Sequence, residues 1–227
     1  MRTYGQYCPI ARASEILAER WTPIILRNLL HGSTTFTQIA AGAPGIPRSL
    51  LTKRLRSLEH AGVIERRSAS GGRVLAYVPT EAGRDLAGVM AALGRWGDRW
   101  IELAPEHLDP GMVLHAWVNW YLATARLPAS RVVVRFDVRA WTGTGKFLWV
   151  IFDGTESEVC LTNPGFEEDL VVDADPRALA EWHLGRIEWV DAVADGRIAV
   201  DGSPTLAHAL PDWNLRSEAA RASRSID

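Results

Sequence analysis

The chain has 227 residues, of which 47% are hydrophobic and 23% are charged, a composition ordinary for folded globular domains. Its two cysteines exclude a disulfide-rich scaffold, and its apolar runs are shorter than the roughly 18 residues of a membrane-spanning helix. Residues 1–104 hold 14 Lys and Arg against 8 Asp and Glu, whereas residues 105–227 hold 11 against 19. A basic half suits a polyanion and an acidic half would be repelled by one. The sequence therefore predicts two domains with different roles, 1–104 and 105–227.

Three short helices are predicted at the start of the chain. Helical spacing of apolar residues indicates the first over residues 8–20. Thr22 as an N-cap and Pro23 in the first turn predict the start of a second helix. The sequence TFTQ at residues 35–38 fits a capping box and predicts a third helix. The glycines and prolines of residues 41–47 then predict a turn.

A fourth helix follows this turn. Pro47 opens it, and its apolar stripe consists of Leu51, Leu55 and Leu58 before Gly62 ends it. The opposite face is polar and basic, and it carries Arg48, Ser49, Thr52, Lys53 and Arg56. Taken alone, such a face is also typical of an amphipathic helix that simply faces water.

A basic hairpin comes next, and it favours a more specific interpretation. Strands over residues 63–67 and 73–78 flank a glycine-containing turn, and they carry Arg66, Arg67 and Arg73. A three-helix core followed by a basic hairpin predicts a mainly α winged helix-turn-helix domain. A helix fits the major groove of double-stranded DNA, and the hairpin fits the adjacent minor groove. We therefore predict DNA contacts from the named residues of the fourth helix and from the three hairpin arginines.

A long helix after Thr80 predicts a homodimer. Its apolar residues follow a heptad-like pattern, in which every seventh residue is apolar and a second series interleaves with the first. This dimerisation seam consists of Leu86, Val89, Leu93, Trp96 and Trp100. The alternative is that the stripe packs on its own domain or on the second half of the chain.

Three segments of the first half also carry a family resemblance: CPIARASEILAERWTPIILRNLLHG, FTQIAAGAPGIPRSLLTKRLRSLEHAGVIERR and AYVPTEAGRDL. Across about residues 7–103 they resemble the HxlR family of bacterial winged-helix regulators. The resemblance implies a homodimeric transcriptional regulator whose recognition helix begins at Pro47. Family members often carry a basic residue just before the Phe-x-x-Ile segment, where this chain has Thr34 and Thr35.

The same resemblance makes Cys8 a candidate redox sensor. A cysteine at this Cys-Pro position senses oxidants or electrophiles in some members of the family. A nearby helix N-terminus and Arg12, one turn on, would favour the thiolate. The alternative is a small buried hydrophobic residue, which is the usual role of a free cysteine.

The second half predicts an α+β domain after a proline-containing linker over residues 104–110. We expect helices packed on a mostly antiparallel sheet, in which the apolar segment 146–154 is a central strand buried on both faces. The predicted helices cover residues 111–125, 176–184, 189–194 and 203–210, and the predicted strands cover residues 131–139, 146–154, 158–162, 169–175 and 197–202.

The segment DADPRALAEWHLGRIEWVDAVADGRIAVDGSPTLAHAL resembles the sterol carrier protein-like fold, and the likeness spans about residues 110–213. It implies an apolar cavity between the helices and the sheet that accepts lipid-like or other hydrophobic small molecules. The candidate lining is aromatic and consists of Trp117, Trp120, Tyr121, Phe147, Trp149, Trp182 and Trp189. A tightly filled aromatic core explains the same residues equally well.

Enzymatic motifs find little support in the sequence. GTGK at residues 143–146 lacks the spacing of a phosphate-binding loop, and the histidines are scattered without metal-ligand spacing. We therefore expect neither catalysis, nor a metal, nor a cofactor, nor a membrane partner. The prediction is a cytoplasmic, homodimeric regulator that binds operator DNA and whose C-terminal domain binds a hydrophobic effector that changes DNA affinity. The alternatives are a filled-core domain that docks a protein partner and a regulator switched at Cys8.

Overall fold

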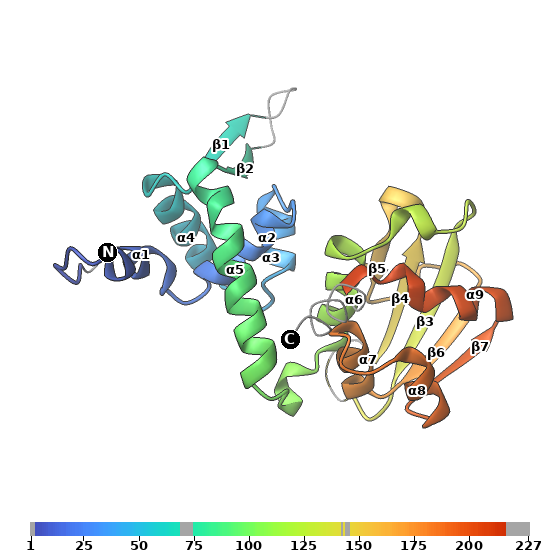
Figure 1. Ribbon diagram of the computed structural model, residues 1–227. Helices are drawn as coiled ribbons and strands as arrows, with labels where there is room; N and C mark the ends of the chain where they lie inside the picture. The colour runs from blue at the N-terminus through green and yellow to red at the C-terminus, as the bar shows by residue number, and fades with distance from the viewer. Residues whose placement is uncertain (1–2, 69–74, 142, 144–145, 217–227) are drawn as a thin grey trace. The chain divides into compact units, whose positions relative to one another are not determined.

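Two compact units make up the computed structural model, Met1–Glu102 and Leu103–Asp227 (Figure 1). The structure describes residues 3–68, 75–141, 143 and 146–216. Within these residues, every helix is too short or too polar to cross a membrane.

The N-terminal unit is a helix-turn-helix domain with a hairpin wing, as the order of its elements predicted. Its described elements are α1 (Pro9–Leu17), α2 (Thr22–Leu30), α3 (Phe36–Ala41), α4 (Arg48–His60), β1 (Ile64–Ser68), β2 (Leu75–Pro79) and α5 (Glu81–Trp100). The core forms where α2, α3 and α4 meet, and Ile25, Leu26, Ile39 and Leu51 are fully buried there. The two wing strands pair antiparallel, with Arg66 opposite Tyr77.

Helix starts in this unit agree with the sequence at two places and differ at a third. At α3 the predicted capping box is confirmed, because Gln38 N–H donates to Thr35 Oγ1 at 3.2 Å and Thr35 N–H donates to Gln38 Oε1 at 3.0 Å. Thr80 caps α5 in the predicted way. At α2 the N-cap is Trp21, in a left-handed conformation with φ of 78°, so the prediction that Thr22 is the cap was wrong. Thr22 is buried and is the first helical residue.

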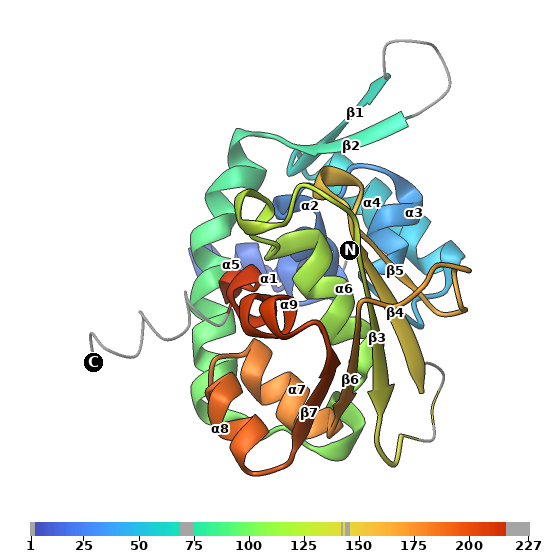
Figure 2. The same cartoon turned by 90° about the vertical axis from the view of Figure 1, so that its right-hand side faces the viewer.

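The C-terminal unit is an α+β domain with a five-stranded mixed sheet. Its described elements are the 3₁₀ turn Pro105–His107, α6 (Pro110–Trp120), the 3₁₀ turn Thr124–Arg126, β3 (Val132–Val138), β4 (Phe147–Phe152), the 3₁₀ turn Gly154–Glu156, β5 (Glu158–Cys160), β6 (Leu170–Ala174), α7 (Pro176–His183), α8 (Trp189–Ala194), β7 (Ile198–Gly202), α9 (Pro204–Ala209) and the 3₁₀ turn Leu210–Trp213. The strand order is β5-β4-β3-β6-β7. Only the β3–β6 pair is parallel, so the sheet is mostly antiparallel as predicted. Helices α6 to α9 lie on one face of this sheet (Figures 1 and 2).

Two details of this unit correct the sequence prediction. The strand predicted to be central is β4; it is an interior strand and almost wholly buried, but β3 occupies the middle of the sheet. The helix predicted over residues 111–125 ends at Trp120. It ends there because the chain turns to pair with the C-terminal segment: Leu122 bridges Asn214, and Ala123 N–H donates to the carbonyl of Trp213 at 2.9 Å.

An aromatic cluster fills the space between α6, α7 and the sheet. Trp117 is fully buried at its centre, and its ring lies 5.3 Å from Phe152 and 4.9 Å from Trp182, measured between centroids. Its indole N–H donates to the carbonyl of Trp213 at 3.0 Å, which satisfies the one polar atom of the buried ring. The alternating residues of β3 face this cluster as predicted: Val132, Val134, Phe136 and Val138.

Candidate nucleic-acid interface

Helix α4 presents a polar and basic face because its opposite side is held in the core. Leu51, Leu55 and Leu58 are each at most 1% exposed, and their spacing of four and three residues fixes the rotation of the helix. The face turned to solvent then carries the predicted set, in which Arg48, Ser49, Lys53 and Arg56 are exposed and Thr52 is half-buried. The structure therefore brings all five predicted residues of α4 to one accessible surface.

Two contacts organise the N-terminal end of this surface. The guanidinium of Arg48 lies over the ring of Phe36, 4.9 Å from its centroid, which ties the start of α4 to the start of α3. The hydroxyl of Thr52 donates to the carbonyl of Arg48 at 3.0 Å. Thr52 can still accept a hydrogen bond or present its methyl group to a base.

Arg54, the remaining cation of α4, has a different role that sequence reasoning missed. Its guanidinium forms an ion pair with Glu19 at 2.6 Å and donates to the carbonyl of Arg20 at 3.1 Å. The side chain is 13% exposed, so it points away from the polar face and fixes α4 against the segment between α1 and α2. The sequence did contain a signal for this role. Arg54 lies three residues after Leu51 and one before Leu55, which places it beside the apolar stripe of α4 and away from the polar face.

The wing carries the predicted arginines, but each described one has an acidic partner. Arg66 Nε lies 2.8 Å from an oxygen of Glu59 at the end of α4, and this hydrogen bond raises the pKa of Arg66. Arg67 pairs with Glu65 on its own strand. Arg73 lies outside the described residues. The wing is therefore less positive than its arginines alone indicate.

A backbone hydrogen bond couples the wing to the helix-turn-helix. Tyr77 N–H on β2 donates to the carbonyl of Thr34 at 2.7 Å. The amide of Thr34 in turn donates to Gln38, the residue that completes the capping box of α3. Thr34 thus connects α3 to the wing.

Helix α5 exposes most of the predicted dimerisation seam. Val89, Leu93, Trp96 and Trp100 are 48%, 51%, 57% and 66% exposed. Leu86, the fifth predicted residue, differs because it packs in part against the core of its own unit. An exposed row of large apolar side chains on one helix is typical of an interaction surface.

Comparison with known proteins identifies this domain. The sequence profile of the HxlR-like helix-turn-helix family matches residues 16–105. The HTH-type transcriptional regulator YvaP of Bacillus subtilis is 34% identical over 107 residues, which cover 46% of this chain and 97% of that protein. The chain belongs to the HxlR-like helix-turn-helix family. It is a DNA-binding transcriptional regulator, and its family is not one of enzymes.

A second relative is YodB, an HTH-type transcriptional regulator of Bacillus subtilis. It is 31% identical over 97 residues, which cover 42% of this chain and 87% of YodB. The crystal structure of quinone-bound YodB matches with 30% identity and a TM-score of 0.36, and the match covers 41% of this chain and 99% of that one. The family match ends at residue 105, so the C-terminal unit stays without a family assignment.

Cys8, the candidate sensor of this HxlR-like domain, is the N-cap residue of α1. Its side chain is half-buried and makes no capping hydrogen bond. Arg12 lies one turn further along, and its backbone N–H donates to the carbonyl of Cys8 at 3.0 Å. The expected helix N-terminus is therefore in place, whereas the effect of the Arg12 guanidinium on the thiol stays a prediction. Its role as a sensor stays a prediction.

The seven aromatic residues predicted to line an effector cavity are not brought together. Phe147 and Trp149 lie on the sheet face opposite the helices, because Trp149 pairs with Arg135 across β3 while the intervening Leu148 faces the core. The indole of Trp149 donates to Glu168 at 2.9 Å. A nearly all-apolar strand offers no alternation from which its two faces can be told apart.

The other five aromatic residues divide between the core and the end of α6. Trp117 and Trp182 belong to the filled cluster, and Trp189 packs on Trp182 with 4.7 Å between ring centroids. Trp120 stands edge-on to His115 at 5.5 Å, and Tyr121 lies 5.7 Å from the ring of His183. Trp182 and Trp189 also line a cavity, which lies between α8, α9 and β7.

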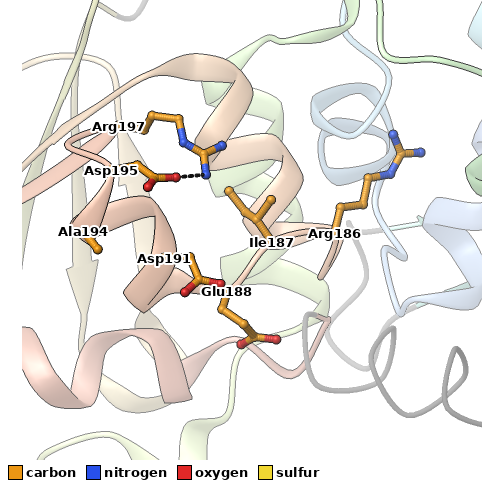
Figure 3. A pocket seen from close by; sticks show the side chains of 7 residues that line it. All are labelled: Arg186, Ile187, Glu188, Asp191, Ala194, Asp195 and Arg197. Carbon is orange, nitrogen blue, oxygen red and sulfur yellow. Dashed lines mark hydrogen bonds and ion pairs between the residues drawn. The ribbon is translucent and has the colours of Figure 1, made fainter.

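This cavity of about 630 Å³ is the better candidate for a small-molecule site. Trp182, Trp189, Val190 and Val193 give it apolar walls, and Glu188 and Asp212 are its carboxylates. A second cavity of about 470 Å³ lies beside α8 and shares Glu188 (Figure 3). Among the described residues, no group of three His, Cys, Asp or Glu side chains is arranged to hold a metal ion.

Proposed function

We propose that α4 is the recognition helix of this regulator and that it enters the major groove of operator DNA. The observation that carries the proposal is the single accessible face on which Arg48, Lys53 and Arg56 surround Ser49 and Thr52. Cations of this kind neutralise phosphates, whereas short hydroxyl side chains can reach base edges. No described residue forms an ion pair with Lys53 or Arg56, so both are available to DNA.

The two classes of residue predict different effects on sequence preference. Thr52→Ala should change which DNA sequences are selected from a random pool, whereas Arg56→Ala should weaken binding to all sequences about equally. Arg95→Ala, an exposed arginine on α5, is the matched control and should change neither property. An unchanged sequence preference in Thr52→Ala, Ser49→Ala and their double variant would contradict the placement of α4 in the groove.

The wing arginines have a secondary role in this proposal. Arg66 and Arg67 must exchange or share Glu59 and Glu65 when they meet phosphates, so each contributes less than a free cation. Tyr77, bound to the carbonyl of Thr34, would hold the wing in register with the recognition helix. Arg73 is part of the proposed set on the sequence alone.

We propose further that two chains pair through α5 to read two half-sites. Leu93→Asp tests this, because Leu93 is 51% exposed and a charge there should leave the fold of one chain intact. In a buried apolar seam the same charge costs several kcal/mol. Light scattering should show monomers of Leu93→Asp and dimers of Ala91→Asp, which places the charge on a different side of the helix. A dimeric Leu93→Asp protein would place the interface elsewhere.

The C-terminal unit is proposed to be a sterol carrier protein-like domain that binds a hydrophobic effector. Helices packed on one face of a mixed sheet and the apolar cavity between α8 and α9 support this proposal. An effector changes DNA affinity only through a difference in its affinity for the two states of the regulator. The test compares the operator affinity of the full chain with and without a hydrophobic compound that it binds. Equal affinities would contradict the effector role and favour the alternative, a domain that docks a protein partner.

Cys8 supports a second candidate trigger, because it is half-buried at a helix N-terminus with Arg12 one turn away. If oxidation of this thiol controls DNA binding, an oxidant should lower the operator affinity of the wild-type protein and leave Cys8→Ser unchanged. Cys160→Ser is the matched control and should respond like the wild type. A response in Cys8→Ser would rule out this trigger.

A further inference from the structure

The cavity between α8 and α9 has walls of unusual chemistry for a simple lipid site. Trp182 and Trp189 stand nearly edge-to-face, at 62° and 4.7 Å between centroids, and present aromatic surface to it. Val190 and Val193 are 69% and 40% exposed, so the apolar walls are reachable from solvent. Exposed valines beside buried indoles indicate a surface that a flat or elongated apolar body would cover.

The charged side chains that line this cavity are predominantly acidic. Its lining includes the carboxylates of Glu188 and Asp212 together with the imidazole of His208, and no Lys or Arg is among its described lining residues. Arg126 approaches from outside this lining and donates to the backbone carbonyl of Asp212 at 3.0 Å. Asp212 is exposed and Glu188 is half-buried, and the surrounding residues 105–227 hold 11 Lys and Arg against 19 Asp and Glu. Such a site repels a fatty acid or another anionic amphiphile, and it attracts a cation.

The neighbouring cavity has different charges. Arg186 and Arg197 contribute to its lining together with Glu188, Asp191 and Asp195, and Arg197 pairs with Asp195 at 2.9 Å (Figure 3). Positive and negative groups are mixed there, and apolar surface is scarce among its lining residues. Of these two cavities, the one between α8 and α9 combines aromatic walls with carboxylates and has no Lys or Arg among its described lining residues.

We propose that this cavity binds a lipophilic cation, a compound with an apolar body and a quaternary or protonated ammonium group. The apolar body would lie on Trp189 and the two valines. The ammonium group would lie against the indole faces and the two carboxylates, because aromatic faces and carboxylates both stabilise a desolvated cation. The proposal rests on the effector role of the C-terminal unit and names the class of effector.

Calorimetric titration of the full chain with three matched probes tests the charge preference. The probes are 4-phenylbutyltrimethylammonium, its uncharged carbon isostere with a tert-butyl head, and 5-phenylpentanoate. All three carry the same apolar body and differ in the charge of the head group. We expect the cation to bind about three- to tenfold more tightly than the neutral isostere. The anion should bind most weakly.

Charge-removing variants locate the site. Glu188→Gln and Asp212→Asn keep the size of each side chain, and each should weaken the cation about threefold or more while changing the neutral probe by less than twofold. Glu167→Gln, an exposed position on the β5–β6 loop, is the matched control and should change neither affinity. Glu188 is the N-cap of α8, so Glu188→Gln could disturb folding. Asp212 is exposed, so Asp212→Asn should fold and keeps the test decisive.

Each result has a clear meaning. Equal binding of cation and neutral isostere, or binding of no probe, would overturn the proposal, as would cation binding that neither variant weakens. Operator affinity measured on the same samples distinguishes the proposed cation site from the proposed effector role of the C-terminal unit. If the cation binds as described but leaves operator affinity unchanged, the cation site stands and the effector role fails.

Discussion

His183, a buried titratable residue of the C-terminal unit, should make folding stability fall at mildly acidic pH. It is 6% exposed, and its Nδ1 lies 2.9 Å from the side-chain nitrogen of Asn214. Asn214 accepts the backbone N–H of Arg216 at 3.0 Å through its oxygen, which leaves its nitrogen to face the imidazole. Burial, together with the positive charge of Arg216, lowers the pKa of His183 from 6.5 to about 3.

The size and direction of the effect follow from these two pKa values. The unfolded chain binds a proton at His183 near pH 6.5, whereas the folded chain does not bind it until about pH 3. The contribution of neutral His183 to the free energy of unfolding is therefore fully present above pH 6.5, and it is lost progressively as the pH falls from 6.5 towards 3. At pH 5, which is 1.5 units below the unfolded value, the loss is about 2 kcal/mol.

Urea denaturation of the full chain at pH 7.5 and pH 5 measures this loss. Tryptophan fluorescence follows the C-terminal unit, because residues 105–227 hold most of the ten tryptophans. His183→Gln retains an acceptor for Asn214 but does not titrate, so its loss between the two pH values should be about 2 kcal/mol smaller than that of the wild type. His208→Gln, an exposed histidine of the same unit, should behave like the wild type. Equal losses in all three proteins would refute a buried neutral His183.

Three further changes test the N-terminal unit. Glu59→Gln frees Arg66 from its ion pair, so DNA affinity in an anisotropy assay should rise about two- to fivefold, and an unchanged affinity would remove Arg66 from the interface. Asn28→Leu deletes a fully buried amide that donates to the carbonyl of Ile39 at 2.9 Å, so the unfolding free energy should drop by about 1–3 kcal/mol, and a smaller loss would mean that water satisfies this carbonyl. Gly83→Ala would place a Cβ 2.1 Å from the carbonyl oxygen of Val63, so α5 must shift and the melting temperature should fall by several degrees; an unchanged value would refute this close packing.

Most of the helix-turn-helix could be predicted from the sequence because its signals are local. The apolar stripe of α4 and the capping box of residues 35–38 each depend on residues within one or two turns. The roles of individual arginines depend on distant partners instead. Arg54 meets Glu19, which is 35 residues away, and Arg66 meets Glu59 only because the chain reverses between α4 and β1.

The candidate site in the C-terminal unit was harder to predict for a related reason. Aromatic residues of this unit were the predicted lining of an effector cavity. Their positions relative to the sheet, however, depend on strand pairing and on where α6 ends. Trp117 became the centre of a filled core, and Trp149 faced the other side of the sheet. The remaining cavity is formed by α8 and α9 against β7, an arrangement that no local pattern encodes.

The central claim is that a dimer binds DNA through the exposed face of α4. The salt dependence of DNA affinity tests this claim most directly. Anisotropy measured on DNA from upstream of the protein's own gene, between 50 and 200 mM salt, gives the slope of log affinity against log salt. If Arg48, Lys53 and Arg56 of two chains each contact one phosphate, six contacts result and the slope should be about −5 or steeper. Arg56→Ala should make it shallower by about 2, because two contacts are lost per dimer. A slope near zero, or one that Arg56→Ala leaves unchanged, would contradict the account.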